Sequence, residues 1–285
     1  MPPLDDSKVE ELEEIARRVR VHVVKSTHEA GSGHPGGSLS ATDILTALYF
    51  EIMDHRPEEP EWPKRDRLAL SKGHAAPALY GVLAEAGYFP VEELMTLRQL
   101  GSRLQGHPHV RTTPGVDAST GSLGQGLSIA AGMALSAKLD RESYQVFAIC
   151  GDGEMQSGQI WEAAMFSSHN KLDNLTVFLD RNMLQIDGST EEVSSIEPII
   201  SKWNSFGWHV LEIEGHDMSQ IYDAVEKSKE VHGQPTIIIA HTIKGKGVPF
   251  MEGSLAFHGK AANDEELEKA LEALGEKDED LEGGE

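Results

Sequence analysis

Two glycines flank a carboxylate at Gly151-Asp152-Gly153, and the amide side chain of Asn182 follows about thirty positions later. Residues 144–150 and 175–180, which precede these two motifs, are apolar runs typical of buried parallel strands. A helical pattern over residues 159–169 separates them. This βαβ unit should place the carboxylate and the amide at one edge of a parallel sheet, where open α/β sheets bind ligands.

The residue types at this edge suit Mg²⁺, which takes hard oxygen ligands and keeps phosphate oxygens and water among them. Asp152 supplies a charged oxygen and Asn182 a neutral one, and the backbone carbonyl of Leu184 could supply a third. The N–H groups of Gly153 and Glu154, at the start of the next helix, could bind an anion. A lone GDG tripeptide is more typical of a tight turn, but its spacing to Asn182 between two strands favours a site for a metal and a diphosphate.

Histidines form a second group of candidate residues. Four of the thirteen lie in glycine-rich loops, namely His34 (SGHPGG), His74 (SKGHAAP), His107 (LQGHPH) and His258 (LAFHGKA). Imidazoles titrate near neutral pH and can move protons or hold hydroxyl groups. The sequence has no HExxH or CxxC pattern, so a zinc site is not expected.

The elements that must position these residues indicate an α/β fold, a parallel sheet with helices on both faces, in one domain over residues 1–275. Further strands are predicted at 68–71, 208–213 and 236–240, and helices at 9–29, from Ser40 or Thr42 to about 53, at 75–86, 91–100, 127–139 and 218–230, and after an Asn263 N-cap. Residues 264–285 hold eleven acids and two lysines, and 276–285 are predicted to form an acidic, disordered tail.

Composition limits the function classes. The formal net charge of −22 argues against nucleic acid or an anionic membrane as a partner. No apolar run approaches 18 residues, so no membrane span is expected. The single cysteine, Cys150, cannot form an internal disulfide, and the acidic, helical N-terminus does not read as a signal peptide. We therefore expect a cytoplasmic protein.

Six ordered motifs together resemble transketolase, specifically its N-terminal half made as a separate subunit. They are SGHPGGSLSATDILTALYF, LALSKGHAAPALYGVL, LRQLGSRLQGHPH, STGSLGQGLSIAAGMALSAK, GDGEMQSGQIWEAAM and FLDRNMLQIDG. The resemblance covers residues 16–259, which is nearly the whole chain.

The resemblance implies thiamine diphosphate as the cofactor, with Mg²⁺ or Ca²⁺ joining it to the protein. The matching positions are Asp152, Asn182 and the Leu184 carbonyl for the metal; His74, Gly121, Ser122, Leu123, Gly153, Glu154, Asn182 and Ile186 for the cofactor; and His34, His107 and His258 for donor hydroxyls and proton transfer. These roles belong to the resemblance and are expectations for this chain.

The implied reaction is transfer of a two-carbon glycolaldehyde unit from a ketose phosphate to an aldose phosphate. Full-length transketolases continue into pyrimidine-binding and C-terminal domains, so the expected partner is a C-terminal subunit that carries them. We expect a heterotetramer and a chain that is inactive alone.

Two departures from the family pattern and three alternatives remain open at this point. Ser157 stands where many transketolases carry an acid of a carboxylate network, although Glu162 matches a second acidic position nearby, and Leu255 stands where many have the first histidine of a His-x-x-His pair. The alternatives are another thiamine diphosphate enzyme, resembling 1-deoxyxylulose 5-phosphate synthase or a 2-oxoacid dehydrogenase; a transketolase for sulfonated or branched sugars; and a non-catalytic binding subunit. The histidine set and GSLGQG favour a ketose donor.

Overall fold

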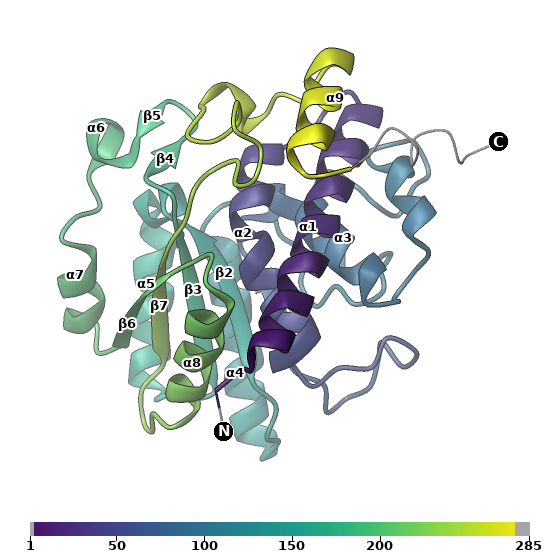
Figure 1. Cartoon of the computed structure of the whole chain (residues 1–285). Helices are drawn as coiled ribbons and strands as arrows, with labels where there is room; N and C mark the ends of the chain where they lie inside the picture. The colour runs from purple at the N-terminus through teal and green to yellow at the C-terminus, as the bar shows by residue number, and fades with distance from the viewer. Residues whose placement is uncertain (1–2, 277–285) are drawn as a thin grey trace.

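The computed structural model of the chain describes residues 3–276 (Figure 1). At its centre lies a five-stranded sheet in the order β1-β2-β3-β7-β6. Its strands are β1 (Arg67–Leu70), β2 (Val146–Gly151), β3 (Leu175–Arg181), β6 (His209–Glu214) and β7 (Thr236–His241). Every neighbouring pair is parallel, so all five carboxyl ends lie at one edge. The predicted α/β fold with a parallel sheet is confirmed.

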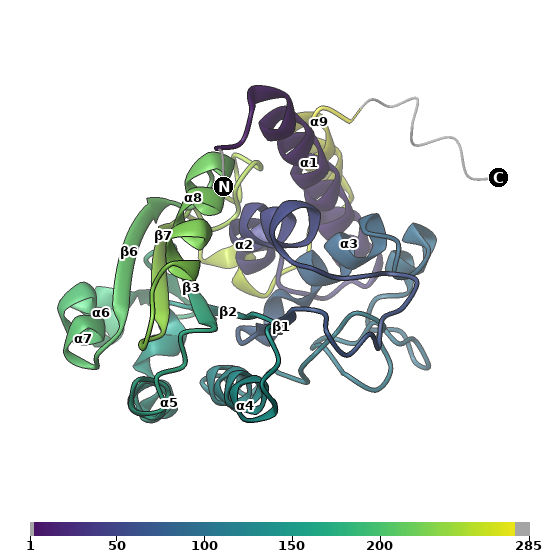
Figure 2. The same cartoon turned by 90° about the horizontal axis from the view of Figure 1, so that it is seen from below.

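Helices cover both faces of this sheet (Figure 2). On one face pack α1 (Asp6–Glu29), α2 (Pro35–Ala47), α3 (Ala76–Glu85), α8 (Met218–Lys229) and α9 (Asp264–Ala273); on the other pack α4 (Gln125–Asp140), α5 (Gly158–His169) and α7 (Ile199–Ser205). A small hairpin, β4 (Leu184–Gln185) and β5 (Gly188–Ser189), and α6 (Thr190–Ser194) follow β3.

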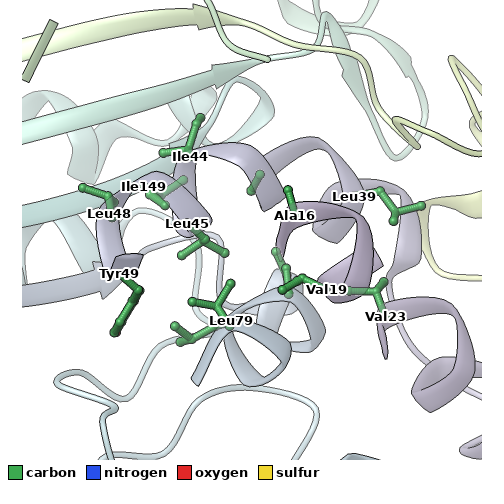
Figure 3. Close-up of a cluster of buried hydrophobic side chains, with 14 of the residues drawn as sticks. Ala16, Val19, Val23, Leu39, Ile44, Leu45, Leu48, Tyr49, Leu79 and Ile149 are labelled. Carbon is green, nitrogen blue, oxygen red and sulfur yellow. The ribbon is translucent and has the colours of Figure 1, made fainter. Parts of the chain in front are cut away.

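Each face has its own buried apolar cluster. In the first cluster, α1, α2 and α3 pack together over strand residues such as Ile149 (Figure 3). The second holds the alanine-rich inner side of α4 together with Trp203 and Trp208. Strands β2 and β3 are buried on both sides, as the apolar runs predicted. These clusters fix the sheet edge that carries the candidate site.

The helix that carries His34 at its N-cap begins earlier than predicted. It starts at Pro35 rather than after an N-cap at Ser40 or Thr42. The Ser40 hydroxyl donates to the Asp180 carboxylate (2.6 Å) and the Thr42 hydroxyl to the Ser38 carbonyl (3.0 Å), so neither side chain caps a helix. Gly36 does not break the helix; a Cβ there would come within 2.8 Å of the Phe257 carbonyl oxygen, so the position requires close backbone approach.

The helix predicted over residues 91–100 was also wrong in type and length. A 3₁₀ helix covers Val91–Thr96. Arg98 adopts a left-handed φ of 60°, which ends the turn, and its N–H donates to the Leu104 carbonyl. The π-helical turn Leu48–Ile52 that extends α2 was not predicted. By contrast, the predicted N-cap at Asn263 is confirmed and forms a capping box with Glu266.

The ends of the chain add two observations. Glu276, the first residue of the predicted acidic tail, forms ion pairs with Arg17 and Lys25 on α1. The rest of that tail, residues 277–285, lies outside the described residues.

Within residues 3–276, no helix is both long enough and apolar enough to cross a bilayer.

Candidate active site at the carboxyl edge of the sheet

The segments after β1, β2, β3 and β7 surround one cavity of about 370 Å³. The predicted site residues that line it are His34, His74, Gly121, Leu123, Asp152, Gly153, Glu154, Asn182, Leu184, Ile186 and His258. The structure thus brings together residues that lie more than two hundred positions apart in the sequence, as the parallel topology predicted.

Two predicted residues, His107 and Ser122, do not line this cavity. The His107 ring packs against Gly121, where a Cβ would come within 2.8 Å of its Cγ and Cδ2. It therefore lies beside the Gly121 segment of the cavity wall, and it is exposed in this chain. Ser122 accepts a hydrogen bond from the Gln125 N–H through its carbonyl, at the start of α4.

Asp152 is a buried carboxylate that backbone N–H groups hold in place. Its Oδ1 accepts from the Gly153 N–H (2.8 Å) and its Oδ2 from the Met183 N–H (2.5 Å). Burial, and then the charge of Asp180, raise the pKa of Asp152 to about 6, although Arg181 lies only 3.4 Å from Oδ2. The ionised form is therefore costly in the protein alone, and a bound cation would stabilise it.

A tight turn after β3 brings two further oxygens to the cavity. Met183 adopts a left-handed φ of 69°, and the Asn182 Oδ1 accepts from the Leu184 N–H (3.2 Å). The described residues contain no group of three or more His, Cys, Asp or Glu side chains that could hold a metal. A metal here would thus take Asp152, the Asn182 amide, the Leu184 carbonyl, phosphate oxygens and water, which is the oxygen-rich set that Mg²⁺ accepts.

The side chain of Glu154 joins the loops around the cavity, a role that the sequence did not predict. Its buried carboxylate accepts from the Ser71 hydroxyl (2.6 Å), the Gly124 N–H (2.7 Å) and the Gly151 N–H (3.1 Å). Because three loops meet at this carboxylate, it fixes their relative positions. Burial raises its pKa.

Two cavity lysines, Lys72 and Lys244, were missed. The Lys72 ammonium donates to the Gly37 carbonyl (2.7 Å) and pairs with Asp180, and both partners are buried. The Lys244 Nζ lies 2.7 Å from His258 Nδ1, and burial with the nearby Lys72 charge lowers its pKa to about 8. Each lysine comes shortly after a buried strand, which is a signal that could have identified both.

The histidines of the cavity form a cluster of neutral rings. The ring centroids of His34, His74 and His258 lie 5.2 to 5.6 Å apart. Burial lowers the pKa of His34 and of His258 to about 4 and also lowers that of His74. Burial and the nearby Arg98 lower the pKa of His107. Near pH 7 these imidazoles are uncharged, so each can donate one hydrogen bond and accept another.

Comparison with known proteins identifies the family of the chain. The sequence matches the family described as transketolase, thiamine diphosphate binding domain, over residues 12–282. The chain belongs to the transketolase family. The resemblance read from the six motifs is confirmed, and the chain is an enzyme subunit of the transferase class.

Relatives of two sizes occur. The chain is 48% identical to the 6-deoxy-6-sulfo-D-fructose transketolase subunit SqwG of Clostridium sp. (strain MSTE9), covering 94% of this chain and 97% of that one. It is 43% identical to an apulose-4-phosphate transketolase subunit of Phocaeicola vulgatus, covering 96% and 98%. Human transketolase is 42% identical over 90% of this chain, but the match spans only 41% of the human protein.

Solved structures of transketolases are also similar to this chain. Transketolase from Campylobacter jejuni superposes with a TM-score of 0.88 at 36% identity, covering 94% of this chain and 43% of that one. This transketolase-family chain thus spans less than half the length of the solved enzymes it matches and nearly all of the subunit relatives.

Proposed function

We propose that this chain is one subunit of a two-subunit transketolase, and that it moves a two-carbon glycolaldehyde unit from a ketose phosphate to an aldose phosphate. The observation that carries the proposal is the composition of one cavity. Oxygen ligands from Asp152, Asn182 and Leu184 share it with the neutral histidines His34 and His258. The first set suits a metal and a diphosphate, and the second suits sugar hydroxyls and a carbonyl.

The residues of the first set would hold Mg²⁺, or Ca²⁺, together with the diphosphate of thiamine diphosphate. Thiamine diphosphate, when bound, supplies the carbon nucleophile that carries the two-carbon unit between sugars. Asp152, Asn182 and the Leu184 carbonyl would bind the metal. The diphosphate would lie by His74, Gly153 and the Glu154 N–H, the segment Gly121, Ser122 and Leu123 would flank the cofactor, and Ile186 would contact its rings.

The histidines would act on the sugar. His34 and His258 line the cavity, so they can hold donor hydroxyls and move protons at substrate oxygens, and His107 would assist them from its place beside Gly121. Their lowered pKa values keep the rings neutral at physiological pH. A neutral ring can exchange donor and acceptor roles without a buried charge being created first.

A C-terminal transketolase chain with the pyrimidine-binding domain is the proposed partner. Leu123 and Ile186 line the cavity and are exposed by 44% and 63%, so apolar surface at the site is left for a partner to cover. Ile129 on α4 and Met165 and Phe166 on α5 are also exposed apolar side chains, suited to contact with another copy of this chain. Together these exposed apolar residues support a heterotetramer.

The names of two relatives add a second candidate class of donor sugar. Because two of them are named for 6-deoxy-6-sulfo-D-fructose and apulose 4-phosphate, a sulfonated or branched ketose is the second candidate donor class. A cytoplasmic location is proposed with this function, since sugar phosphates are intracellular metabolites and the lone Cys150 is buried and free.

The test is a transfer assay with ribose 5-phosphate as acceptor, thiamine diphosphate and Mg²⁺. Xylulose 5-phosphate, 6-deoxy-6-sulfofructose and apulose 4-phosphate are compared as donors, using this chain alone, the co-expressed C-terminal partner alone and the pair. We expect turnover only from the pair. Robust turnover by this chain alone would refute the two-subunit proposal. An assembled pair that shows no activity with any of the three donors would refute the proposed reaction.

A further inference from the structure

Arg98 lies between two of the histidine-bearing loops. Its NH1 donates to the Ser32 hydroxyl (3.3 Å) and its NH2 lies 3.4 Å from the Nδ1 of His34. The guanidinium also packs against Gly106, next to His107, since a Cβ at Gly106 would come within 2.7 Å of its Cζ. Within residues 3–276, no carboxylate pairs with Arg98, so its charge faces uncharged groups.

The contact with Arg98 determines which nitrogen of His34 carries the proton. A guanidinium has N–H donors and no acceptor. A neutral imidazole has one of each, so the Nδ1 of His34 must accept and its proton must lie on Nε2. The Nε2 has no protein hydrogen bond among the described residues and lies on the Gly259 side of the ring, 3.6 Å from the position of a Cβ there.

Lys244 stands in the same relation to His258. Its Nζ lies 2.7 Å from the Nδ1 of that ring. An ammonium also has donors only, and with a pKa of about 8 this lysine is protonated near pH 7. The Nδ1 of His258 therefore accepts, and its proton lies on Nε2, which has no protein partner in the described part of the chain.

We propose that Arg98 and Lys244 are positioning residues that hold His34 and His258 in the Nε2–H tautomer, so that both rings present N–H donors to the substrate. This rests on the proposed function, which assigns the cavity to a ketose. In the resting enzyme the two rings then act as hydrogen-bond donors to a substrate oxygen that gains negative charge. Such donors act most strongly when they are oriented before the reaction starts.

Neutron crystallography of the complete two-subunit enzyme at pD 7 tests the tautomers without any turnover. We expect deuterons on the Nε2 of His34 and His258 and none on their Nδ1 atoms. A deuteron on the Nδ1 of either neutral ring would overturn the proposal. Because this readout needs no activity, it remains informative even if the proposed reaction proves wrong.

Two substitutions at Arg98 give a functional test in the same complex, with xylulose 5-phosphate and ribose 5-phosphate as probes. Arg98→Lys keeps a donor facing His34 and should retain kcat within about fivefold. Arg98→Glu supplies an acceptor, moves the ring proton to Nδ1 and should lower kcat about 100-fold, as expected for loss of one preoriented donor. Equal activities of the two folded variants would contradict the proposal, and if Arg98→Glu fails to assemble, the neutron result decides.

Discussion

Replacing Asp152 by Asn should stabilise the unliganded chain while it removes the response to metal and cofactor. The carboxylate is buried, and its pKa of about 6 in the folded protein lies above the ordinary 3.8. The ionised form therefore costs folding free energy, and the neutral amide of Asn avoids that cost.

The magnitude follows from the difference between the two pKa values. A shift from 3.8 to about 6, at 1.36 kcal/mol per pH unit, corresponds to about 3 kcal/mol once the pH exceeds 6. Because the folded pKa of this acid is raised, the penalty is absent below pH 3.8 and grows as the pH rises to 6. Asp152 accepts two backbone hydrogen bonds, and Asn at this position can keep only one of them, which costs about 1 kcal/mol of folding free energy. The net gain at pH 7.5 is then about 2 kcal/mol.

Urea denaturation of wild-type chain and Asp152→Asn at pH 7.5 and pH 4.5, with and without thiamine diphosphate and Mg²⁺, measures both effects. We expect the variant to be more stable at pH 7.5 without ligand, to lose most of that advantage at pH 4.5, and to show no stabilisation by the ligands. An Asp152→Asn chain less stable than wild type at pH 7.5, or one still stabilised by metal and cofactor, would refute the reasoning.

Three further predictions, each with its own variants, use the same denaturation assay. Lys72→Met leaves the buried Asp180 without its cation and should lower the free energy of unfolding by about 3–5 kcal/mol. The double variant with Asp180→Asn should recover most of that loss. A loss below about 1 kcal/mol in Lys72→Met would contradict the buried pair. Gly73→Ala places a Cβ within 2.7 Å of a facing backbone nitrogen and should lower the free energy of unfolding by about 1–3 kcal/mol. Gly158→Ala, which has open space around it, is the control and should leave that free energy nearly unchanged. Equal effects of the two variants would argue against the close approach at Gly73. Asn263→Ala should cost about 1 kcal/mol through the lost cap of α9, and no change in the unfolding free energy would count against the cap.

The sequence predicted the parts of the site that regular elements position. Asp152 and Asn182 follow buried strands, and parallel strands end at one edge, so their proximity follows from the pattern alone. The same logic applies to Lys72 and Lys244 near the ends of β1 and β7, where the signal was present and overlooked.

Other contacts could not be predicted because irregular segments make them. Arg98 reaches His34 from the loop after a 3₁₀ helix, where no periodicity shows which way a side chain points. The buried carboxylate of Glu154 joins three loops whose mutual approach exists only in the folded protein. The early start of α2 was not predicted because glycine is unfavourable inside a helix, whereas Gly36 here permits the close approach of another loop.

The most direct test of the central claim is the crystal structure of this chain with its C-terminal partner, thiamine diphosphate and Mn²⁺ in place of Mg²⁺. Anomalous scattering locates the metal independently of the protein atoms. The account predicts an anomalous peak bonded to Asp152, Asn182 and the Leu184 carbonyl, with the diphosphate completing its ligands. A bound cofactor whose metal and diphosphate lie away from these three residues would contradict it.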